Sequence, residues 1–581
     1  MPRSANSGNP FDRMNQILTR STMEHAPERT KSEQRIWFYF ALVTVAAIVV
    51  AALRWSLAHP YGIDWDEAEY LNDIQIDGQR FRTGHLLKLA GRILIRNLDR
   101  PPAYRLFALP FVGVFGYHTT EARLISLTCF ALSTFFVFLS VRRISTPAAG
   151  AFAALVFAVS PEVVSASIFF GTDTSLYLAT AAMLYYIFVC WSGGGERTSS
   201  WVGLGCAVGL GFLAKTSFIL IALPVFAFWF VASHWTALKI PLLSSQRKAG
   251  ALAFLIAGPW WVLNVRGAIA YGLYARGFVA NSLGSPSLAT WTRWLETVVR
   301  CLLGSGLSIL IGLILIVFIV RLIRKQLTLN HLQTAAVGAC ACAGLPIIAA
   351  QLSGTNHLLR HITPSVIPLA IVIGVFVSVS GWMESWVATA ISLILFCAQA
   401  VVLIAPVARP NQEALDPGFV NGALPSRTMI HFDQWDWRPV MELADSCGLK
   451  APEISVLGGG RQLNPPQIQF PWVSRTTSTK DERLLIPNVT WLWRHEGGLL
   501  EWQKIVDGAH ESDMAITAPY YVGEVKGRDD PDDRYNAEFE ELLSRDPRFQ
   551  GPFLFQMGRF APIEIAVFMR KDLPCPLSAK P

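Results

Sequence analysis

Four carboxylates lie within six positions in the segment Y-G-I-D-W-D-E-A-E-Y (61–70). Like charges held this close raise one another's pKa or require a cation between them. A positioned carboxylate can remove the proton of a substrate hydroxyl, which makes Asp66 and Glu67 candidate catalytic residues. Their oxygens are also suitable ligands for a divalent cation, so the same two residues are candidates for a metal site. A solvated acidic turn is the alternative interpretation.

A further carboxylate, Asp173, follows an apolar segment in S-I-F-F-G-T-D-T-S-L-Y-L (167–178). An ionisable residue at the end of a membrane span is costly, and it is a functional candidate by default. We therefore predict that Asp173 is another catalytic carboxylate. The alternative is a helix cap, because Asp stabilises helix N-termini.

Basic residues recur in four other segments: R-P-P-A-Y-R (100–105), G-L-G-F-L-A-K (209–215), P-W-W-V-L-N-V-R (259–266) and R-H-I-T-P-S-V-I-P (360–368). A single Lys or Arg at a span end is usually an anchor whose charge reaches the membrane surface. Cations opposite carboxylates, however, suit an anionic substrate that must also lose a proton. We predict that four of these residues bind the substrate: Arg105, Lys215, Arg266 and Arg360.

The elements that must position these residues are membrane helices. The 581 residues are 52% hydrophobic and 16% charged, whereas soluble domains carry about 25% charged residues. This composition excludes a soluble enzyme, a disordered protein and a single-span receptor. About eleven apolar segments, in a range of 10 to 13, are long enough to span a membrane: 36–54, 121–141, 147–166, 174–191, 200–216, 218–234, 249–266, 302–322, 333–352, 363–380 and 386–405.

The charges of the connecting loops predict the orientation. Positive residues are expected on the cytoplasmic side, and alternate loops carry them, for example Arg142 with Arg143 and Arg321 with Arg324. We therefore predict a disordered cytoplasmic tail at 1–35, a membrane core at 36–405 and a soluble α/β domain at 406–581. With an odd number of spans, the soluble domain and the loop 55–120 lie outside. The use of Arg and Ala favours a bacterial inner membrane.

Within the outer loop, residues 85–99 place Lys88, Arg92 and Arg96 on one side of an amphipathic helix. Such a helix is suited to the headgroup layer of a membrane, with an ordinary packed helix as the alternative.

In the C-terminal domain, strands are expected at 453–457, 514–518 and 563–569, and helices at 437–445 and 536–544. Its two cysteines, Cys447 and Cys575, can form a disulfide. We predict no catalytic residue in 411–581, where His431 and Asp433 are the nearest candidates.

Taken in order, these motifs resemble the GT-C integral-membrane glycosyltransferases, close to the protein O-mannosyltransferases and the bacterial aminoarabinose–lipid A transferases. The resemblance covers roughly residues 36–405 and implies a polyprenyl-phosphate-linked sugar as donor and an active site on the outer face. It implies Asp66 as the base, Asp173 as another site carboxylate, and Lys215 and Arg266 as ligands of the donor phosphate. The sequence departs from the family at Ala103 and His361, and Trp435-Asp436-Trp437 is not the oligosaccharyltransferase motif.

The expected reaction is a single displacement on a hydroxyl acceptor, which can be a lipid, a glycan or a protein. A phosphodiester leaving group needs cations, and the hydroxyl needs a base. No cofactor is therefore required, although a divalent cation is compatible with Asp66 and Glu67. A transporter or flippase of a lipid-linked or anionic solute is the alternative function, and no basic stripe predicts nucleic-acid binding.

Overall fold

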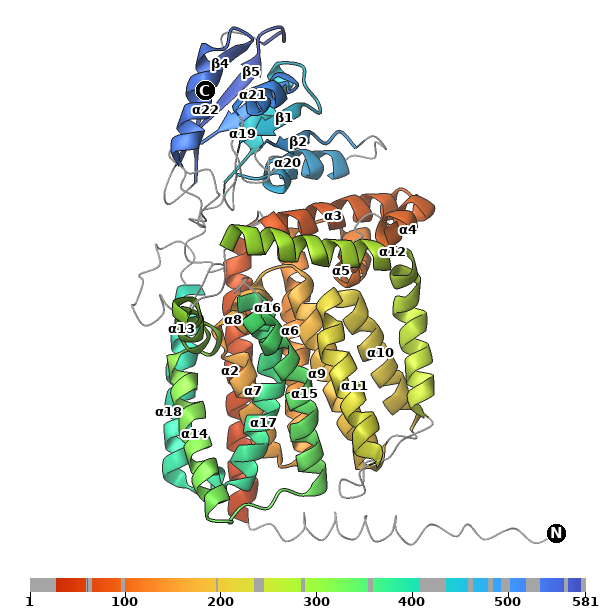
Figure 1. Ribbon diagram of the computed structural model, residues 1–581, viewed down its shortest axis with the longest axis vertical. Helices are drawn as coiled ribbons and strands as arrows, with labels where there is room; N and C mark the ends of the chain where they lie inside the picture. Colours follow the sequence, from red (N-terminus) through yellow and green to blue (C-terminus); the bar gives the residue numbers. More distant parts are fainter. Residues whose placement is uncertain are drawn as a thin grey trace, which may run out of the picture.

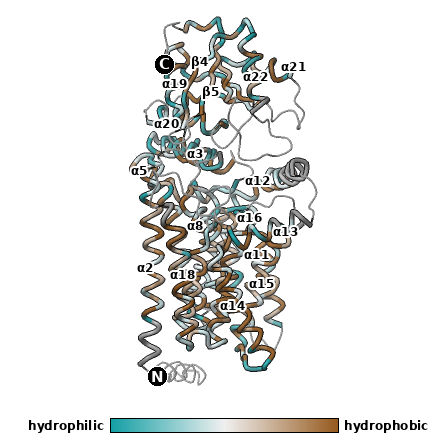
Figure 2. The backbone as a smooth tube through the Cα atoms, turned by 90° about the vertical axis from the view of Figure 1, so that its left-hand side faces the viewer, coloured by the Kyte–Doolittle hydropathy of each residue, from teal (hydrophilic) through white to brown (hydrophobic). Residues whose placement is uncertain are grey.

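The computed structural model describes residues 28–58, 60, 65–95, 100–194, 197–234, 245–283, 288–353, 359–407, 435–457, 463–478, 484–492, 502–518, 533–558 and 563–575. Helices form a bundle, and a small α/β domain sits at one end of it (Figure 1). The bundle is largely hydrophobic, whereas the domain and the layer below it are more hydrophilic (Figure 2). The predicted fold class, a polytopic helical membrane protein with a C-terminal α/β domain, is confirmed.

Each predicted span coincides with a helix or with a bent pair of helices. These elements are α2 (Glu28–Ala58), α6 (Thr119–Ile144), α7 (Pro147–Ala158) with α8 (Pro161–Ile168), α9 (Thr172–Val189), α10 (Thr198–Ala214), α11 (Ile219–His234), α12 (Ser245–Leu283), α14 (Ser305–Ile323), α15 (His331–Ser353), α17 (Val366–Val379) and α18 (Trp386–Val407). Within the described ranges, nine helices are long and apolar enough to cross a membrane, and the α7–α8 pair makes a tenth. The shorter α10, with 17 residues, accounts for the remaining predicted segment.

The first span starts earlier than the sequence indicates. Helix α2 begins at Glu28, so residues 28–35, which were assigned to the tail, are helical. Its first residues lie at the end of the bundle opposite the α/β domain (Figure 1).

The bend between α7 and α8 shapes the end of the bundle nearer the domain. The two helix axes differ in direction by 66°. Pro161, the first residue of α8, has no N–H to donate to the Phe157 carbonyl. The Ser160 backbone N–H donates to that carbonyl (3.3 Å), and the Ser160 hydroxyl donates to the Val156 carbonyl (2.8 Å). A short turn then leads to α9, whose first turn contains Asp173.

The segment between the first two spans folds into three helices, α3 (Trp65–Arg82), α4 (Leu86–Ile95) and α5 (Ala103–Phe115). Arg92 of α4 is buried between two carboxylates of α3, with N–O distances of 2.5 Å to Asp73 and 2.6 Å to Asp77. Arg105 of α5 donates from Nε to the other side of Asp77 (2.6 Å). Buried charges are tolerated when they are paired in this way, and the network holds the three helices together.

The structure supports a packed helix at 86–95, not one lying free in the headgroup layer. Arg92, which was expected on the polar face, is only 5% exposed. Leu86, Leu87 and Lys88 are exposed, and Arg96 lies outside the described residues, so the sequence correctly predicted a helix here but not the burial of Arg92.

The C-terminal domain is built on a five-stranded sheet with the order β2-β1-β3-β5-β4. The strands are β1 (Glu453–Val456), β2 (Asn488–Trp491), β3 (Met514–Thr517), β4 (Phe549–Met557) and β5 (Ile563–Arg570), and the helices are α19 (Arg438–Ser446), α20 (Pro465–Ser478), α21 (Trp502–His510) and α22 (Asp533–Arg545). Strand β1 is parallel to β2 and β3, and β5 is antiparallel to β3 and β4. The three predicted strands and both predicted helices are present, whereas β2, β4, α20 and α21 were not anticipated.

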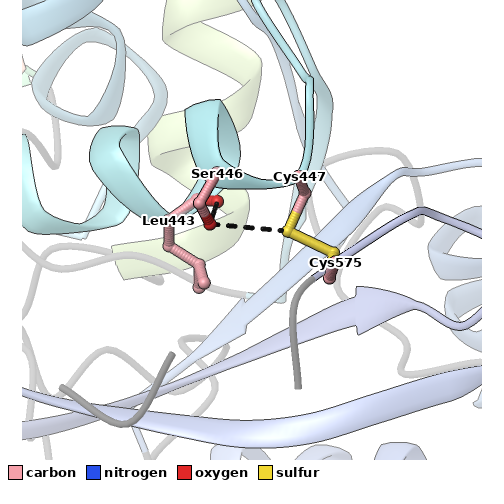
Figure 3. Close-up of a disulfide and its surroundings, with 4 residues drawn as sticks. All are labelled: Leu443, Ser446, Cys447 and Cys575. Carbon is pink, nitrogen blue, oxygen red and sulfur yellow. Dashed lines mark hydrogen bonds between the residues drawn. A yellow bond between two sulfur atoms is a disulfide. The ribbon is translucent and has the colours of Figure 1, made fainter. Parts of the chain in front are cut away.

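A disulfide joins the two cysteines of this domain. Cys447 follows α19 and bonds to Cys575 near the end of the described chain (Figure 3). The pairing that the sequence allowed is therefore formed, and it ties α19 to the segment after β5.

Helix α20 seats the C-terminal domain on α3. The side-chain amide of Asn72 donates to the Pro466 carbonyl (2.9 Å), and that of Gln79 donates to the Thr476 carbonyl (3.2 Å). The Ser474 hydroxyl donates to Gln75 (2.9 Å). The C-terminal domain thus contacts α3, the helix that carries Asp66.

Candidate active site

Asp66 lies in the first turn of α3 and faces two arginines. Its Oδ2 accepts a short hydrogen bond from Arg360 of α16 (Leu359–Ile362), and its Oδ1 lies 3.4 Å from Arg100, just before α5. The side chains of Asp66, Arg100 and Arg360 are 19%, 20% and 25% exposed. Residues separated by almost 300 positions therefore meet in a cluster that solvent can still reach.

Asp173 forms the other ion pair at this end of the bundle. Its Oδ1 accepts from the Lys215 ammonium at 2.6 Å. Lys215 has an extended backbone between α10 and the short helix that follows it, which directs its side chain toward α9. Gly171, not Asp173, occupies the N-cap of α9, so the interpretation of Asp173 as the capping residue is wrong.

The arginines control the charge of Asp66. Burial raises the pKa of this carboxyl, but Arg360 and Arg100 outweigh burial, with a smaller effect of Lys215, and the pKa falls from 3.8 to about 2. Asp66 is therefore ionised at neutral pH and is a weak base while the arginines hold it. Because Lys215 affects Asp66, the two ion pairs act on one another electrostatically.

Arg100 is a site residue that the sequence prediction did not select. It bridges Asp66 and Glu69, with an N–O distance of 2.6 Å to Glu69, and its guanidinium lies 5.3 Å from the centre of the Tyr70 ring. Burial raises the pKa of Glu69, although Arg100 opposes this shift. The motif R-P-P-A-Y-R contained the signal, but it offered two arginines without indicating which one faces the carboxylates.

Arg105, the other arginine of that motif, is buried at 1% exposure and bonded to Asp77 through both Nε and Nη2. It also donates to the carbonyl of Arg92 (3.1 Å). Its geometry is that of a helix-packing residue within the network of α3, α4 and α5. The prediction that Arg105 contacts the donor phosphate does not agree with this placement.

Glu67 is separated from the site although it follows Asp66 in sequence. Both of its carboxylate oxygens accept from Arg123 of α6 at 2.8 Å, and one also accepts from the backbone N–H of Phe170 (2.9 Å). Neither Glu67 nor Arg123 is exposed. Glu67 therefore joins α3 to α6 and to the turn before α9, and this geometry does not support the predicted catalytic role.

The last predicted cation, Arg266, does not join the cluster. It lies on α12 with an exposed side chain, and within the described ranges it forms no ion pair with Asp66 or Asp173. Of the four predicted phosphate ligands, the structure brings only Lys215 and Arg360 to the carboxylates.

The structure also bears on the suggested metal and on the C-terminal domain. Among the described residues, no three His, Cys, Asp or Glu side chains are grouped as ligands of a metal ion.

His431 and Asp433, the candidates named for the C-terminal domain, lie outside the described residues. An unpredicted pair, His510 and Asp546 (2.5 Å), joins α21 to the turn before β4, where it holds the domain together away from the carboxylate–cation cluster.

The sequence and the fold of this chain are similar to those of known membrane glycosyltransferases. Residues 99–262, less than a third of the chain, match the family model of dolichyl-phosphate-mannose-protein mannosyltransferases. The structure resembles the crystal structure of ArnT from Cupriavidus metallidurans bound to undecaprenyl phosphate, with a TM-score of 0.52 and 14% identity over 90% of this chain and 97% of that one. The apo structure of ArnT gives a TM-score of 0.51 with the same identity and coverage.

The chain has the GT-C glycosyltransferase fold. The resemblance inferred from the motifs is thereby confirmed: residues 99–262 match the mannosyltransferase family model, and the fold resembles that of ArnT. An oligosaccharyltransferase of Archaeoglobus fulgidus is also similar, at 12% identity over 83% of this chain and 70% of that one, with a lower TM-score of 0.48. No curated protein sequence shows a significant match.

Proposed function

We propose that this chain is a glycosyltransferase that moves a sugar from a polyprenyl-phosphate carrier to a hydroxyl acceptor. The observation that carries the proposal is the pair of carboxylates, Asp66 and Asp173, held against Arg100, Arg360 and Lys215 at one end of a membrane bundle. The GT-C fold and the match of residues 99–262 support it. A donor with a polyprenyl tail also explains why the site lies at the end of membrane helices.

The cations fit the leaving group. When the bond between the sugar and the phosphate breaks, negative charge develops on the phosphate oxygens. Arg and Lys side chains stabilise that charge through charge-assisted hydrogen bonds. Arg360 pairs with Asp66 and Lys215 pairs with Asp173, and both cations are about one quarter exposed, so each is accessible to a phosphate.

The carboxylate fits the acceptor. A hydroxyl becomes a better nucleophile when a positioned base takes its proton, but Asp66 is a weak base in the resting site because two arginines hold it. A donor phosphate would compete with Asp66 for Arg360 and Arg100. Binding of the donor would therefore free the carboxylate and raise its pKa at the moment when a base is needed.

This partner exchange assigns different roles to the two ion pairs. Asp66 is proposed as the base, with Arg360 and Arg100 as ligands of the phosphate. Asp173 is proposed to hold Lys215 toward the same phosphate, at the distance of 2.6 Å seen in the resting site. No metal is needed in this scheme.

The outer face of a bacterial inner membrane is the proposed location of the site. The site and the C-terminal domain lie at the same end of the bundle (Figure 1). Arg142, Arg143 and Arg321 lie at the helix ends away from it, as the positive-inside rule requires of a cytoplasmic side. The disulfide of Cys447 and Cys575 supports an oxidising compartment for the domain.

The direct test is transfer by the purified protein in nanodiscs from a panel of undecaprenyl-phosphate sugars, followed by mass spectrometry of the products. We expect at least one donor to be consumed, with undecaprenyl phosphate released. Envelope lipids and glycans from cells lacking the gene identify the acceptor by the modification that disappears. If no donor is consumed and the protein instead moves a lipid-linked solute between leaflets, the transporter alternative replaces this proposal.

A further inference from the structure

Among the residues that the structure describes, Glu162 is the buried carboxylate of the membrane bundle for which no cation partner is found. Four other buried carboxylates, Glu67, Asp73, Asp77 and Asp173, each form an ion pair with Arg or Lys. Glu162 is 2% exposed, and its Oε2 atom has no hydrogen-bond partner among the residues that the structure describes. A buried polar atom without a partner costs free energy, so this position requires an explanation.

The surroundings of Glu162 connect it to the site. It lies in the first turn of α8, directly after the bend of 66°. The charged groups that act on it electrostatically are Asp173 and Arg360, which belong to the two ion pairs of the site. Helix α8 also contacts α9, α16 and the helical turn Val298–Leu303, so elements that bear site residues pack against it.

The position of Glu162 relative to Arg360 indicates what it could bind. In the proposed function Arg360 holds the donor phosphate, and the sugar is bonded directly to that phosphate. A group on α8, which packs against the helices that carry Arg360 and Asp173, therefore lies near the bond between the phosphate and the sugar. Sugar hydroxyls are hydrogen-bond donors, and a carboxyl oxygen without a partner is an acceptor.

We infer that Glu162 is a further substrate-binding residue, whose carboxyl accepts a hydrogen bond from a hydroxyl of the donor sugar. This inference rests on the proposed function and adds the residue that distinguishes a sugar-bearing carrier from the bare carrier. Because an unsatisfied site group disfavours a ligand that cannot pair with it, Glu162 also selects among sugars by the hydroxyl that reaches it.

The test compares two ligands in nanodiscs: undecaprenyl phosphate, and the undecaprenyl-phosphate sugar that the wild-type protein consumes. The variants are Glu162→Gln, which keeps the shape, and Glu162→Leu, which removes the acceptor. We expect both to bind undecaprenyl phosphate like the wild type. Affinity for the sugar-bearing carrier should fall by roughly 10- to 100-fold in Glu162→Leu, and by less in Glu162→Gln.

Glu121→Gln is the matched control. Glu121 also has a buried carboxyl oxygen without a partner among the described residues, but it lies in the first turn of α6, which bears none of the residues of the carboxylate–cation cluster. It should leave both affinities unchanged. Thermal unfolding in the same nanodiscs verifies that each variant is folded, and Glu162→Gln should be at least as stable as the wild type because it removes an unpaired buried carboxyl.

The outcomes separate the inference from the function on which it depends. If the wild type consumes no sugar-bearing carrier, the proposed function fails. If the wild type is active and the Glu162 variants bind both ligands normally, the inference alone is wrong. The inference is also overturned if the variants lose transfer without losing affinity for the sugar-bearing carrier, because Glu162 would then act on the acceptor or in the chemistry.

Discussion

Replacing Asp66 by Asn should strengthen the binding of undecaprenyl phosphate while it abolishes most of the turnover. The substitution keeps the size of the side chain but removes the charge that Arg360 and Arg100 now neutralise. Arg360 then becomes available to the phosphate, and Arg100 keeps only its pair with Glu69. Opposite effects on binding and on turnover in one variant are not expected of a residue that only supports the fold.

The size of the binding effect follows from the electrostatics of the site. The difference between the usual pKa of 3.8 and the value of about 2 for Asp66 is equivalent to about 2 kcal/mol in favour of the ionised carboxylate. Because burial opposes the arginines, this net energy is the least that the two arginines contribute to the ionised Asp66, and Asp66→Asn removes that competition for the phosphate. Affinity for undecaprenyl phosphate should therefore rise by roughly 30-fold in Asp66→Asn.

Turnover should change in the other direction. Loss of a general base typically lowers the rate by roughly 10²–10⁴-fold, and single-turnover transfer in nanodiscs measures this step apart from product release. Asp445→Asn is the matched control, because it breaks an exposed pair with Arg475 in the C-terminal domain and should change neither quantity. An Asp66→Asn protein with weaker carrier binding, or with normal transfer, would refute the partner exchange.

Three further substitutions and a pair of fusions test the other assignments. Lys215→Gln removes a charge-assisted contact to the phosphate and should weaken undecaprenyl-phosphate binding by roughly 10- to 100-fold, as measured by titration in nanodiscs. Arg266→Gln should leave that affinity unchanged, because its side chain is exposed on α12; a loss similar to that of Lys215→Gln would restore it as a ligand. Glu67→Gln breaks a fully buried pair with Arg123 and should lower the free energy of unfolding by about 3 kcal/mol or more, seen as a lower unfolding temperature; normal stability with lost turnover would instead return Glu67 to the catalytic set. Alkaline phosphatase fused after Pro410 should be active in the periplasm and, fused after Arg143, inactive, and the reverse pattern would place the site on the cytoplasmic side.

The sequence predicted the membrane architecture well because spanning length and hydropathy are local properties. Every apolar segment of the prediction corresponds to a helix or to the α7–α8 pair. The bend at Ser160 and Pro161 was missed because the apolar segment 147–166 continues across it. The start of α2 at Glu28 was missed because residues 28–35 are polar. Hydropathy therefore indicated a start at residue 36, although the helix begins eight residues earlier.

The site was predicted less completely because side-chain direction depends on partners that are distant in sequence. Asp66 and Glu67 are neighbours, but consecutive residues of a helix point about 100° apart. One therefore faces Arg100 and Arg360, and the other faces Arg123 of α6. Knowing that α3 starts at Trp65 would have been enough to predict this separation. The acidic segment 61–70, however, carries no pattern from which that start could be identified.

The two arginines of R-P-P-A-Y-R show the same difficulty. Arg100 lies before α5 and reaches Asp66, whereas Arg105 lies within α5 and is buried against Asp77. The partner of Arg105 lies in α3, at a position where the sequence alone gives no reason to expect a buried carboxylate. The order of the motifs thus identified the correct end of the bundle, and the fold decided which residue of each motif belongs to the site.

The most direct measurement is an electron cryo-microscopy structure of the protein in nanodiscs with undecaprenyl phosphate. We expect phosphate density in contact with Arg360 and Lys215, and an Asp66 carboxylate that no longer pairs with Arg360. Phosphate bound elsewhere in the bundle, or bound while the Asp66–Arg360 pair remains intact, would contradict it.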